Sequence, residues 1–403
     1  MRVKFIEKLK ILNANNFEIY LYKLQMQEMN ALVKHISGPG LELQQVPIPE
    51  PGPGEVLIKI HKSSICGTDV HIYNWDEWAQ QHIKPPVVIG HEYVGEIFKV
   101  GEGCTKYKVG QRVSGEGHIT CRKCEHCQRG DIQFCEETIS VGVNRSGAFA
   151  EYVCIPECNV IEIDESFPEE FVSFFDAFGN ATHASMMWEL KNKAVLITGA
   201  GPIGIMSAGI CKHKGARLVV ITDVNDYRLE LAKKMGADVC VNLSKCNLKE
   251  VLSEYNIGKG FDVGLEMSGN GKALKDMINL VHNGGEISLL GLSGQPIEVD
   301  MSKIILKGLR LQGVYGRKVE TWKQMSEMVR EGFDMRPLIT HRYHYTEFKE
   351  AFEKMSSGYS GKIVLDWTTK EKDTTITPSA SESTFEEEKK QKNTESNTNQ
   401  HLC

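Results

Sequence analysis

The chain has 403 residues, of which 41% are hydrophobic and 25% are charged, and its formal net charge is −6. This composition is typical of a folded globular protein and excludes a largely disordered chain. The mild acidity argues against nucleic acid as a partner, and no uninterrupted apolar run approaches the roughly 18 residues that a membrane span needs. Because a single core stops growing at roughly 250–300 residues, we expect two domains.

The N-terminal extension, residues 1–28, mixes Lys with Glu and Asn. It lacks the apolar core and cleavage site of a secretory signal, and it fits poorly the Arg-rich, acid-poor composition of a mitochondrial transit peptide. We therefore expect a cytoplasmic location, with only weak support for mitochondria, and reduced cysteines. Met26 and Met29 are alternative starts.

Residues 29–178 have the pattern of a domain of short strands and loops with frequent Gly and Pro. The segment EVLIKIHKSSI at 55–65 alternates apolar Val56, Ile58 and Ile60 with polar neighbours, which predicts a half-buried strand.

One set of metal-ligand types is dispersed in this domain. Cys66 in SSICGTDVH and the adjacent His91 and Glu92 in VVIGHEYVGE offer sulfur, nitrogen and oxygen donors. A catalytic zinc uses three such protein ligands and keeps one position open. Taken alone, the same residues also fit a core cysteine and a salt-linked pair at a strand start.

A second set is compact. Cys121, Cys124, Cys127 and Cys135 lie in TCRKCEHCQRGDIQFC, three at three-residue spacing and the fourth eight residues further. In a reducing compartment this pattern predicts a closed tetrahedral structural zinc site. Paired disulfides and an iron–sulfur cluster are the alternatives.

The pattern changes in residues 179–315. Short apolar runs at 195–198, 217–222, 261–267 and 286–291 alternate with helical stretches such as 226–237 and 271–284. This alternation predicts an α/β fold with a doubly wound parallel sheet and crossover helices.

A glycine motif follows the first of these runs. Gly199, Gly201 and Gly204 form G-x-G-x-x-G in VLITGAGPIGI, and Asp223 ends the next strand nineteen residues later. The glycines admit a pyrophosphate to a helix N-terminus, and the carboxylate can bind the ribose hydroxyls. Its charge favours NAD over NADP, with Arg228 flanking the ribose. The alternative is a glycine-rich turn with a surface Asp.

The last two segments differ sharply. Residues 316–367 contain two amphipathic helical patterns and the strand KIVLDW, and this block is too short to stand alone, so we expect it to pack on the first domain. Residues 368–403 have almost no large apolar side chains, which predicts a disordered tail.

Several motifs together resemble the zinc-containing medium-chain dehydrogenases over about residues 30–367. They are ICGTDVHIYNWDEW, GHEYVGE, GEGHIT, FDAFGNATH and ITGAGPIGI. The segments HIYNWDEW, GEGHIT and FDAFGNATH are specific to the L-threonine 3-dehydrogenase branch of that family.

The resemblance implies a GroES-like catalytic domain, a Rossmann domain and an active site between them. It assigns the catalytic zinc to Cys66, His91 and Glu92, and a proton relay to Thr68 and His71. It places Asp176 either on the zinc or on its water; a structural, hydrogen-bonded Asp is the alternative. Ala177 replaces a proline that the family often has.

The resemblance also implies NAD contacts, two zinc ions per chain, a homotetramer and the oxidation of L-threonine to 2-amino-3-oxobutanoate. Another secondary alcohol or polyol dehydrogenase, acting on butanediol or sorbitol, is the nearest alternative, and an inactive NAD-binding relative is the more distant one. The NAD contacts carried over are Ile203, Asp223, Arg228, Leu290, Gly291, Leu292, Val314 and Tyr315.

Overall fold

The computed structural model describes residues 28–246, 248, 253–255 and 257–368. The predicted N-terminal extension and polar tail, apart from Glu28 and Thr368, lie outside the described residues. Across the described part of the chain, no helix combines the length and apolar character needed to cross a membrane.

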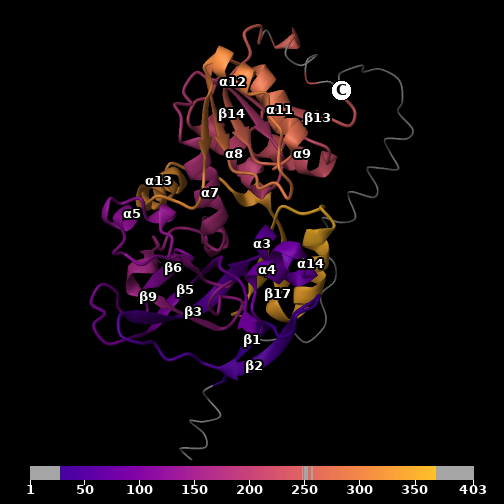
Figure 1. Ribbon diagram of the computed structural model, residues 1–403. Coiled ribbons are helices and arrows are strands. Elements are labelled where there is room, and N and C mark those ends of the chain that lie inside the picture. Colours follow the sequence, from indigo (N-terminus) through magenta and orange to yellow (C-terminus); the bar gives the residue numbers. More distant parts are fainter. Residues whose placement is uncertain (1–27, 247, 249–252, 256, 369–403) are drawn as a thin grey trace, which may run out of the picture.

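A six-stranded parallel sheet forms the part of the molecule at the top of Figure 1. Its strand order, β13-β12-β11-β14-β15-β16, is that of a doubly wound nucleotide-binding sheet, so the predicted fold class is confirmed. The strands are β11 (Ala194–Thr198), β12 (Leu218–Asp223), β13 (Val239–Asn242), β14 (Phe261–Glu266), β15 (Val281–Leu289) and β16 (Arg310–Gly313).

Both faces of this sheet are covered. Successive residues of β11 belong to different cores: Val195 and Ile197 lie in one hydrophobic cluster, and Ala194 and Leu196 in another. This explains the uninterrupted apolar run, because side chains alternate across a strand and helices cover both faces. The covering helices include α7 (Phe175–Ser185), α8 (Pro202–His213), α9 (Asp226–Lys234), α11 (Gly271–Leu280) and α12 (Met301–Lys307).

One boundary differs from the sequence pattern. The helical stretch predicted over 271–284 ends at Leu280, and residues 281–284 belong to β15. Gly284 has φ +78°, a left-handed conformation that cannot continue an α-helix. The apolar spacing alone therefore extended the helix too far.

The lower part of the molecule contains a seven-stranded sheet of order β10-β6-β5-β3-β18-β17, with β9 also paired to β3. The chain returns to this sheet after the parallel sheet is complete, because β18 pairs antiparallel with β3. The strands are β3 (Glu55–Ser64), β5 (Tyr93–Val100), β6 (Arg112–Gly115), β9 (Tyr152–Pro156), β10 (Val160–Glu162), β17 (Ile339–His344) and β18 (Lys362–Asp366).

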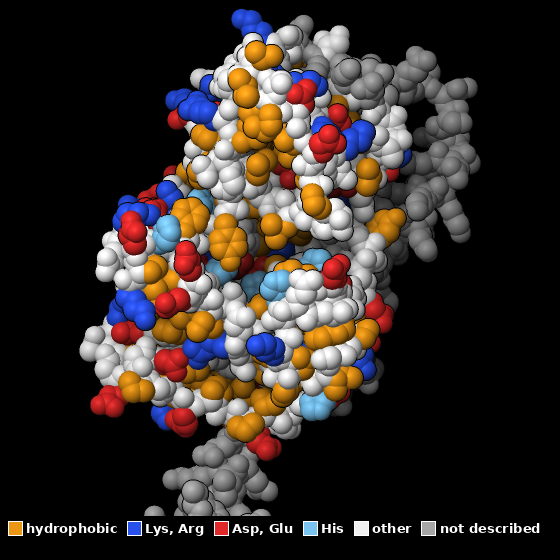
Figure 2. Space-filling model, in the orientation of Figure 1, with side chains coloured by type: hydrophobic (Ala, Val, Ile, Leu, Met, Phe, Trp, Pro, Cys, Tyr) orange, Lys and Arg blue, Asp and Glu red, His pale blue; other side chains and the backbone are white. Residues whose placement is uncertain are grey.

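Smaller elements complete the described chain. They are β1 (Glu28–Lys34), β2 (Glu42–Pro47), α3 (Gly67–Asn74), α4 (Glu77–His82), β4 (Val87–Val88), β7 (His118–Ile119), α5 (Glu125–Gln128), η1 (Ile132–Phe134), β8 (Ile139–Ser140), η2 (Glu157–Asn159), α6 (Glu169–Val172), α13 (Val319–Arg330), η3 (Arg336–Leu338), η4 (Tyr345–Glu347) and α14 (Phe348–Ser356). Of these, α13 contacts α7, and η3 contacts α8 and α9, so both pack on the helices of the parallel sheet. Figure 2 shows that the surface is hollowed between the upper and lower parts, and that histidine and hydrophobic side chains gather around the hollow.

Candidate active site

Three potential metal donors meet beside the seven-stranded sheet. One donor atom each from Cys66, His91 and Glu92 lies within 4.8 Å of the others. Cys66 is the N-cap of α3, and the other two residues immediately precede β5. Gly90 has φ +90°, and a Cβ there would lie 2.3 Å from the Phe149 ring, so glycine is required at the turn that delivers His91.

The two oxygens of the Glu92 carboxylate have different surroundings, as expected of a metal ligand. Its Oε2 accepts a hydrogen bond from Lys362 Nζ at 2.5 Å, whereas the buried Oε1 has no hydrogen-bond partner. A buried carboxylate oxygen without a partner is unfavourable unless a cation binds it. The three donors therefore fit a zinc ion, which accepts sulfur, nitrogen and oxygen ligands together.

Two further residues support these donors, and the sequence motifs did not reveal their roles. Asp69 accepts a hydrogen bond from the Cys66 amide at 2.8 Å, and its other oxygen lies 3.6 Å from His91 Nδ1. Burial raises the pKa of the Asp69 carboxyl to about 6. Lys362 also donates to the Ile65 carbonyl at 2.9 Å. Carboxylate and cation partners of this kind orient metal ligands.

Asp176 lies close to this group without belonging to it. It is 7% exposed, and its Oδ1 is 2.6 Å from Arg317 Nη2. Burial alone would raise the pKa of Asp176, but the Arg317 guanidinium lowers it below its usual range. Arg317 is fully enclosed and also binds both oxygens of Glu116, at 2.5 and 2.8 Å. Neither Glu116 nor Arg317 belonged to a predicted site.

The two predicted relay residues share α3 with Cys66. Thr68 Oγ1 is 3.9 Å from Cys66 Sγ, at the start of the helix. His71 is in the last turn, its side chain is 57% exposed, and its Nδ1 contacts the carboxylate of Asp76. One short helix therefore carries a metal donor at its first end and a solvent-exposed imidazole at its other end.

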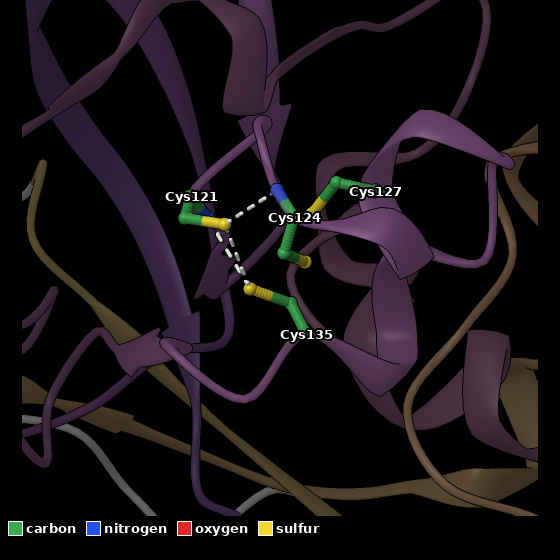
Figure 3. A group of neighbouring side chains, drawn as sticks. All are labelled: Cys121, Cys124, Cys127 and Cys135. Atoms are coloured by element: carbon green, nitrogen blue, oxygen red, sulfur yellow. Dashed lines mark hydrogen bonds between the residues drawn. The ribbon is translucent and has the colours of Figure 1, made fainter.

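The four clustered cysteines converge on one another (Figure 3). Their sulfur atoms all lie within 4.8 Å of one another, and Cys121 Sγ is 3.5 Å from Cys135 Sγ. A disulfide requires about 2.05 Å, so these are separate thiols, whereas ligands of one tetrahedral zinc are roughly 3.8 Å apart. Amides also point at the sulfurs: Cys124 N donates to Cys121 Sγ at 3.3 Å.

The glycine motif forms a tight turn between β11 and α8. Gly199 has φ +90°, and a Cβ on Gly204 would lie 2.0 Å from the Gly199 carbonyl. Asp223 closes the turn, because its Oδ2 accepts a hydrogen bond from Ala200 N at 2.6 Å while Oδ1 accepts from the amides of Val224 and Asn225. The Asp223 carboxylate therefore stabilises the glycine turn through these hydrogen bonds and also lies beside it.

The remaining predicted nucleotide contacts lie at the same edge of the parallel sheet. Ile203 is in the first turn of α8 and Arg228 in the first turn of α9. Residues 290–292 follow β15, and residues 314–315 follow β16. Ligands of open parallel sheets bind at this carboxyl edge. Leu292 and Tyr315 are 91% and 58% exposed, so both apolar side chains are available to a ligand.

A short series of contacts joins this edge to the metal donors. The rings of Tyr315 and His118 have centroids 5.9 Å apart. A Cβ on Gly117, the residue before His118, would lie 3.6 Å from His91 Cβ. Arg317, two residues after Tyr315, binds Asp176. The predicted nucleotide segment and the predicted metal site therefore face one another across the hollow.

Comparisons with known proteins agree with this geometry. Residues 52–165 match the alcohol dehydrogenase GroES-like domain, and residues 202–331 match the zinc-binding dehydrogenase domain. L-threonine 3-dehydrogenase of Rhizobium rhizogenes is 53% identical over 340 residues, covering 84% of this chain and 99% of the relative.

Solved structures show the same architecture. A short chain alcohol dehydrogenase of Escherichia coli complexed with NADH has a TM-score of 0.78 and 28% identity, covering 85% of this chain and 100% of that chain. A zinc-binding dehydrogenase of Sinorhizobium meliloti bound to NADP has a TM-score of 0.78 and 26% identity, covering 84% and 99%.

Proposed function

Because this chain belongs to the L-threonine 3-dehydrogenases of the zinc-binding dehydrogenase family, we propose that its hollow is the active site in which L-threonine is oxidised to 2-amino-3-oxobutanoate. The observation that carries this proposal is the juxtaposition of Cys66, His91 and Glu92 with the carboxyl edge of the parallel sheet. An alcohol held at the donors would lie beside a dinucleotide held at that edge.

The chemistry divides between bound groups and the chain. Zinc, when bound, acidifies an alcohol, and NAD accepts a hydride. Cys66, His91 and Glu92 would hold the zinc and leave one position for the substrate. Lys362 and Asp69 keep two of these donors in place. The chain thus supplies binding, orientation and proton transfer.

We assign the hydroxyl proton to a relay through Thr68 and His71. The hydroxyl of Thr68 can accept one proton and donate another, and the exposed ring of His71 can exchange a proton with water. Asp176 stays ionised beside Arg317, so its charge faces the donors without needing a proton. We therefore give Asp176 an electrostatic role and leave the proton path to α3.

The cofactor preference and the metal count are parts of the same proposal. Asp223 would repel the 2′-phosphate of NADP, so we propose NAD as the preferred cofactor. We propose a second, structural zinc held by Cys121, Cys124, Cys127 and Cys135, because the four thiols converge (Figure 3) and their sulfur atoms all lie within 4.8 Å of one another.

The family resemblance also leads us to propose a cytoplasmic homotetramer. Sedimentation of the purified full chain tests the assembly, and fractionation of the source cells tests the location. A monomer at micromolar concentration would contradict the assembly proposal.

Initial rates of NADH formation test the function. Purified, zinc-loaded protein is assayed with L-threonine, 2,3-butanediol, sorbitol and 2-propanol at matched concentrations. We expect the highest kcat/KM for L-threonine. A higher kcat/KM for any of the other alcohols would overturn the substrate assignment while keeping the dehydrogenase assignment.

A further inference from the structure

The contact between Asp76 and His71 points to a role for a residue outside the predicted site. We propose that Asp76 is a positioning residue, which holds the His71 ring so that Nδ1 carries the hydrogen and Nε2 presents the lone pair that accepts the relayed proton. This inference rests on the relay assigned to His71 under the proposed function.

The backbone between α3 and α4 fixes the positions of His71 and Asp76 relative to one another. α3 ends at Asn74, and Trp75 follows in the left-handed conformation, with φ 56° and ψ 45°. This reversal allows Asp76 to begin α4 directly, and the Asp76 amide donates to the His71 carbonyl at 3.4 Å. The two residues therefore face one another across a turn of only four residues.

Each oxygen of Asp76 has a different partner. Oδ1 accepts a hydrogen bond from Ala79 N at 3.0 Å, which is an N-cap for α4, and Oδ2 contacts His71 Nδ1. An N-cap needs only one oxygen, and Asn or Ser would serve equally well. The second oxygen is thus available for the imidazole, and the cap fixes the direction in which it points.

The chemistry of the pair sets the tautomer. An ionised carboxylate only accepts hydrogen bonds, so the imidazole nitrogen facing it must carry a hydrogen. Partial burial would raise the pKa of Asp76, but the hydrogen bonds from Ala79 and His71 outweigh it and lower that pKa. A neutral His71 then has its lone pair on Nε2.

The proton balance follows from this arrangement. The Nε2 lone pair accepts the proton that leaves the Thr68 hydroxyl, and the imidazolium is stabilised by the adjacent carboxylate. Water then takes the proton from Nε2, while the Nδ1 hydrogen never leaves the ring. The exposed fractions of the two side chains, 57% for His71 and 39% for Asp76, give water the access that this release requires.

Asp76→Asn separates the two functions of the carboxylate. The amide oxygen can still cap α4, which turns the amide NH₂ toward His71 Nδ1 and makes that nitrogen an acceptor. The hydrogen then moves to Nε2, and the relay nitrogen loses its lone pair. Asp76→Ser is the matched variant, because it keeps the cap and removes the carboxylate that contacts Nδ1, while the ring contact with Trp78 remains.

The experiment uses the zinc-loaded full chain. Imidazole nitrogen chemical shifts are expected to show the Nδ1–H tautomer of neutral His71 in the wild type and the Nε2–H tautomer in Asp76→Asn, with an unchanged Tm. The kcat of Asp76→Asn with L-threonine is expected to fall at least about tenfold. This loss should not exceed that of His71→Asn, for which we expect about 10²–10⁴-fold. In the His71→Asn background, Asp76→Asn is expected to leave kcat unchanged.

Two results would overturn the inference. One is an Nε2–H tautomer in the wild type. The other is an equal loss of kcat from Asp76→Asn with and without His71, which would mean that Asp76 only supports the loop. A wild-type kcat in His71→Asn would instead reject the relay itself, and the chemical shifts would still decide whether Asp76 sets the tautomer.

Discussion

Lys362 Nζ lies 2.5 Å from Glu92 Oε2, although 270 residues separate the two in the sequence. Both side chains are almost completely enclosed, with exposed fractions of 1% and 0%. A buried carboxylate that keeps its charge needs a cation, and here one oxygen has Lys362 while the other is free for a metal. The ion pair thus prepares Glu92 as a ligand before any metal binds.

Lys362→Met tests this preparation. Without Lys362, the metal-free protein retains an uncompensated buried carboxylate, so we expect it to lose about 3–5 kcal/mol of stability. The zinc-loaded protein should lose less, because the metal replaces part of the missing charge. Thermal unfolding with and without a chelator measures both effects. Lys62→Met is the control. It removes a more exposed ion pair, between Lys62 and Asp366, and Asp366 lies on the same strand as Lys362. Equal losses in the two metal states would contradict the role assigned to Lys362.

Cys124→Ser tests the count of metal ions. We expect two zinc ions per wild-type chain and one in the variant, together with a lower Tm, because a structural zinc stabilises the fold that it binds. Elemental analysis of dialysed protein gives the count. Cys158→Ser is the control, because Cys158 is an exposed thiol outside the four-cysteine cluster. A single zinc in fully loaded wild-type protein would reject the two-site proposal.

Asp223→Asn tests the cofactor preference at some cost to the turn, because only one of the two side-chain positions that accept backbone hydrogen bonds remains an acceptor. The amide oxygen can still accept a backbone hydrogen bond, whereas the charge that opposes a 2′-phosphate is gone. A unit charge over about 4 Å is worth about 1–4 kcal/mol, so the ratio of kcat/KM for NAD to that for NADP should narrow by roughly tenfold or more. Asp226→Asn, at an exposed carboxylate of α9, should leave the ratio unchanged. Comparable use of both cofactors by the wild type would disprove the role of Asp223.

His71→Asn tests the relay. We expect kcat to fall about 10²–10⁴-fold, the usual contribution of a positioned acid–base group, with zinc content and Tm preserved. His82→Asn is a matched control, because His82 lies at the end of α4 and its ring stacks on Trp78. If His71 were only structural, the variant would lose stability while each folded, zinc-loaded molecule kept its activity.

Lys34→Met tests a charge buried away from the metal donors. Lys34 Nζ donates to the carbonyls of Gly38 and Gly40 and lies 4.9 Å from the centre of the Trp75 ring, with no carboxylate bound to it in the described part of the chain. Burial lowers the pKa of Lys34 from 10.5 to about 8. Between these values the unfolded chain holds a proton that the folded chain has released, so this group adds stability as the pH rises from 8 to 10.5.

The measurement is the Tm of wild type and variant across that range. We expect the difference, wild type minus Lys34→Met, to increase from pH 8 to pH 10. The subtraction cancels the other titrating groups. A constant difference would show that Lys34 keeps an ordinary pKa in the folded protein.

The sequence predicted the features that depend on neighbouring residues. The glycine turn follows from Gly199 and Gly204, and the thiol cluster follows from the spacing of Cys121 to Cys135, because each is completed within a short stretch of chain. The alternation of apolar runs with helical stretches predicted the parallel sheet, because each strand and each crossover helix has its own local pattern even though the sheet itself spans Ala194–Gly313.

The partners of the donors were not predictable in this way. Lys362 meets Glu92 only after β18 pairs with β3, and Arg317 meets Glu116 only after the segments that follow β16 and β6 come together from the two sheets. A single Lys or Arg in a polar stretch carries no local signal of burial. Asp69 is the exception, because its position three residues after Cys66 places it on the same short helix, where a carboxylate can reach the donors.

The pairing of β18 with β3 also constrains the order of events during synthesis. All six strands of the parallel sheet lie between Ala194 and Gly313, so that sheet can close on the nascent chain while residues 62–64 of β3 still lack their neighbour. An open strand edge can pair with other chains, so residues 62–64 of β3 are exposed to aggregation during this interval. The same late strand brings Lys362, and a ribosome that stalls before it would therefore leave a nucleotide-binding unit beside metal donors that have never acquired their charge partner.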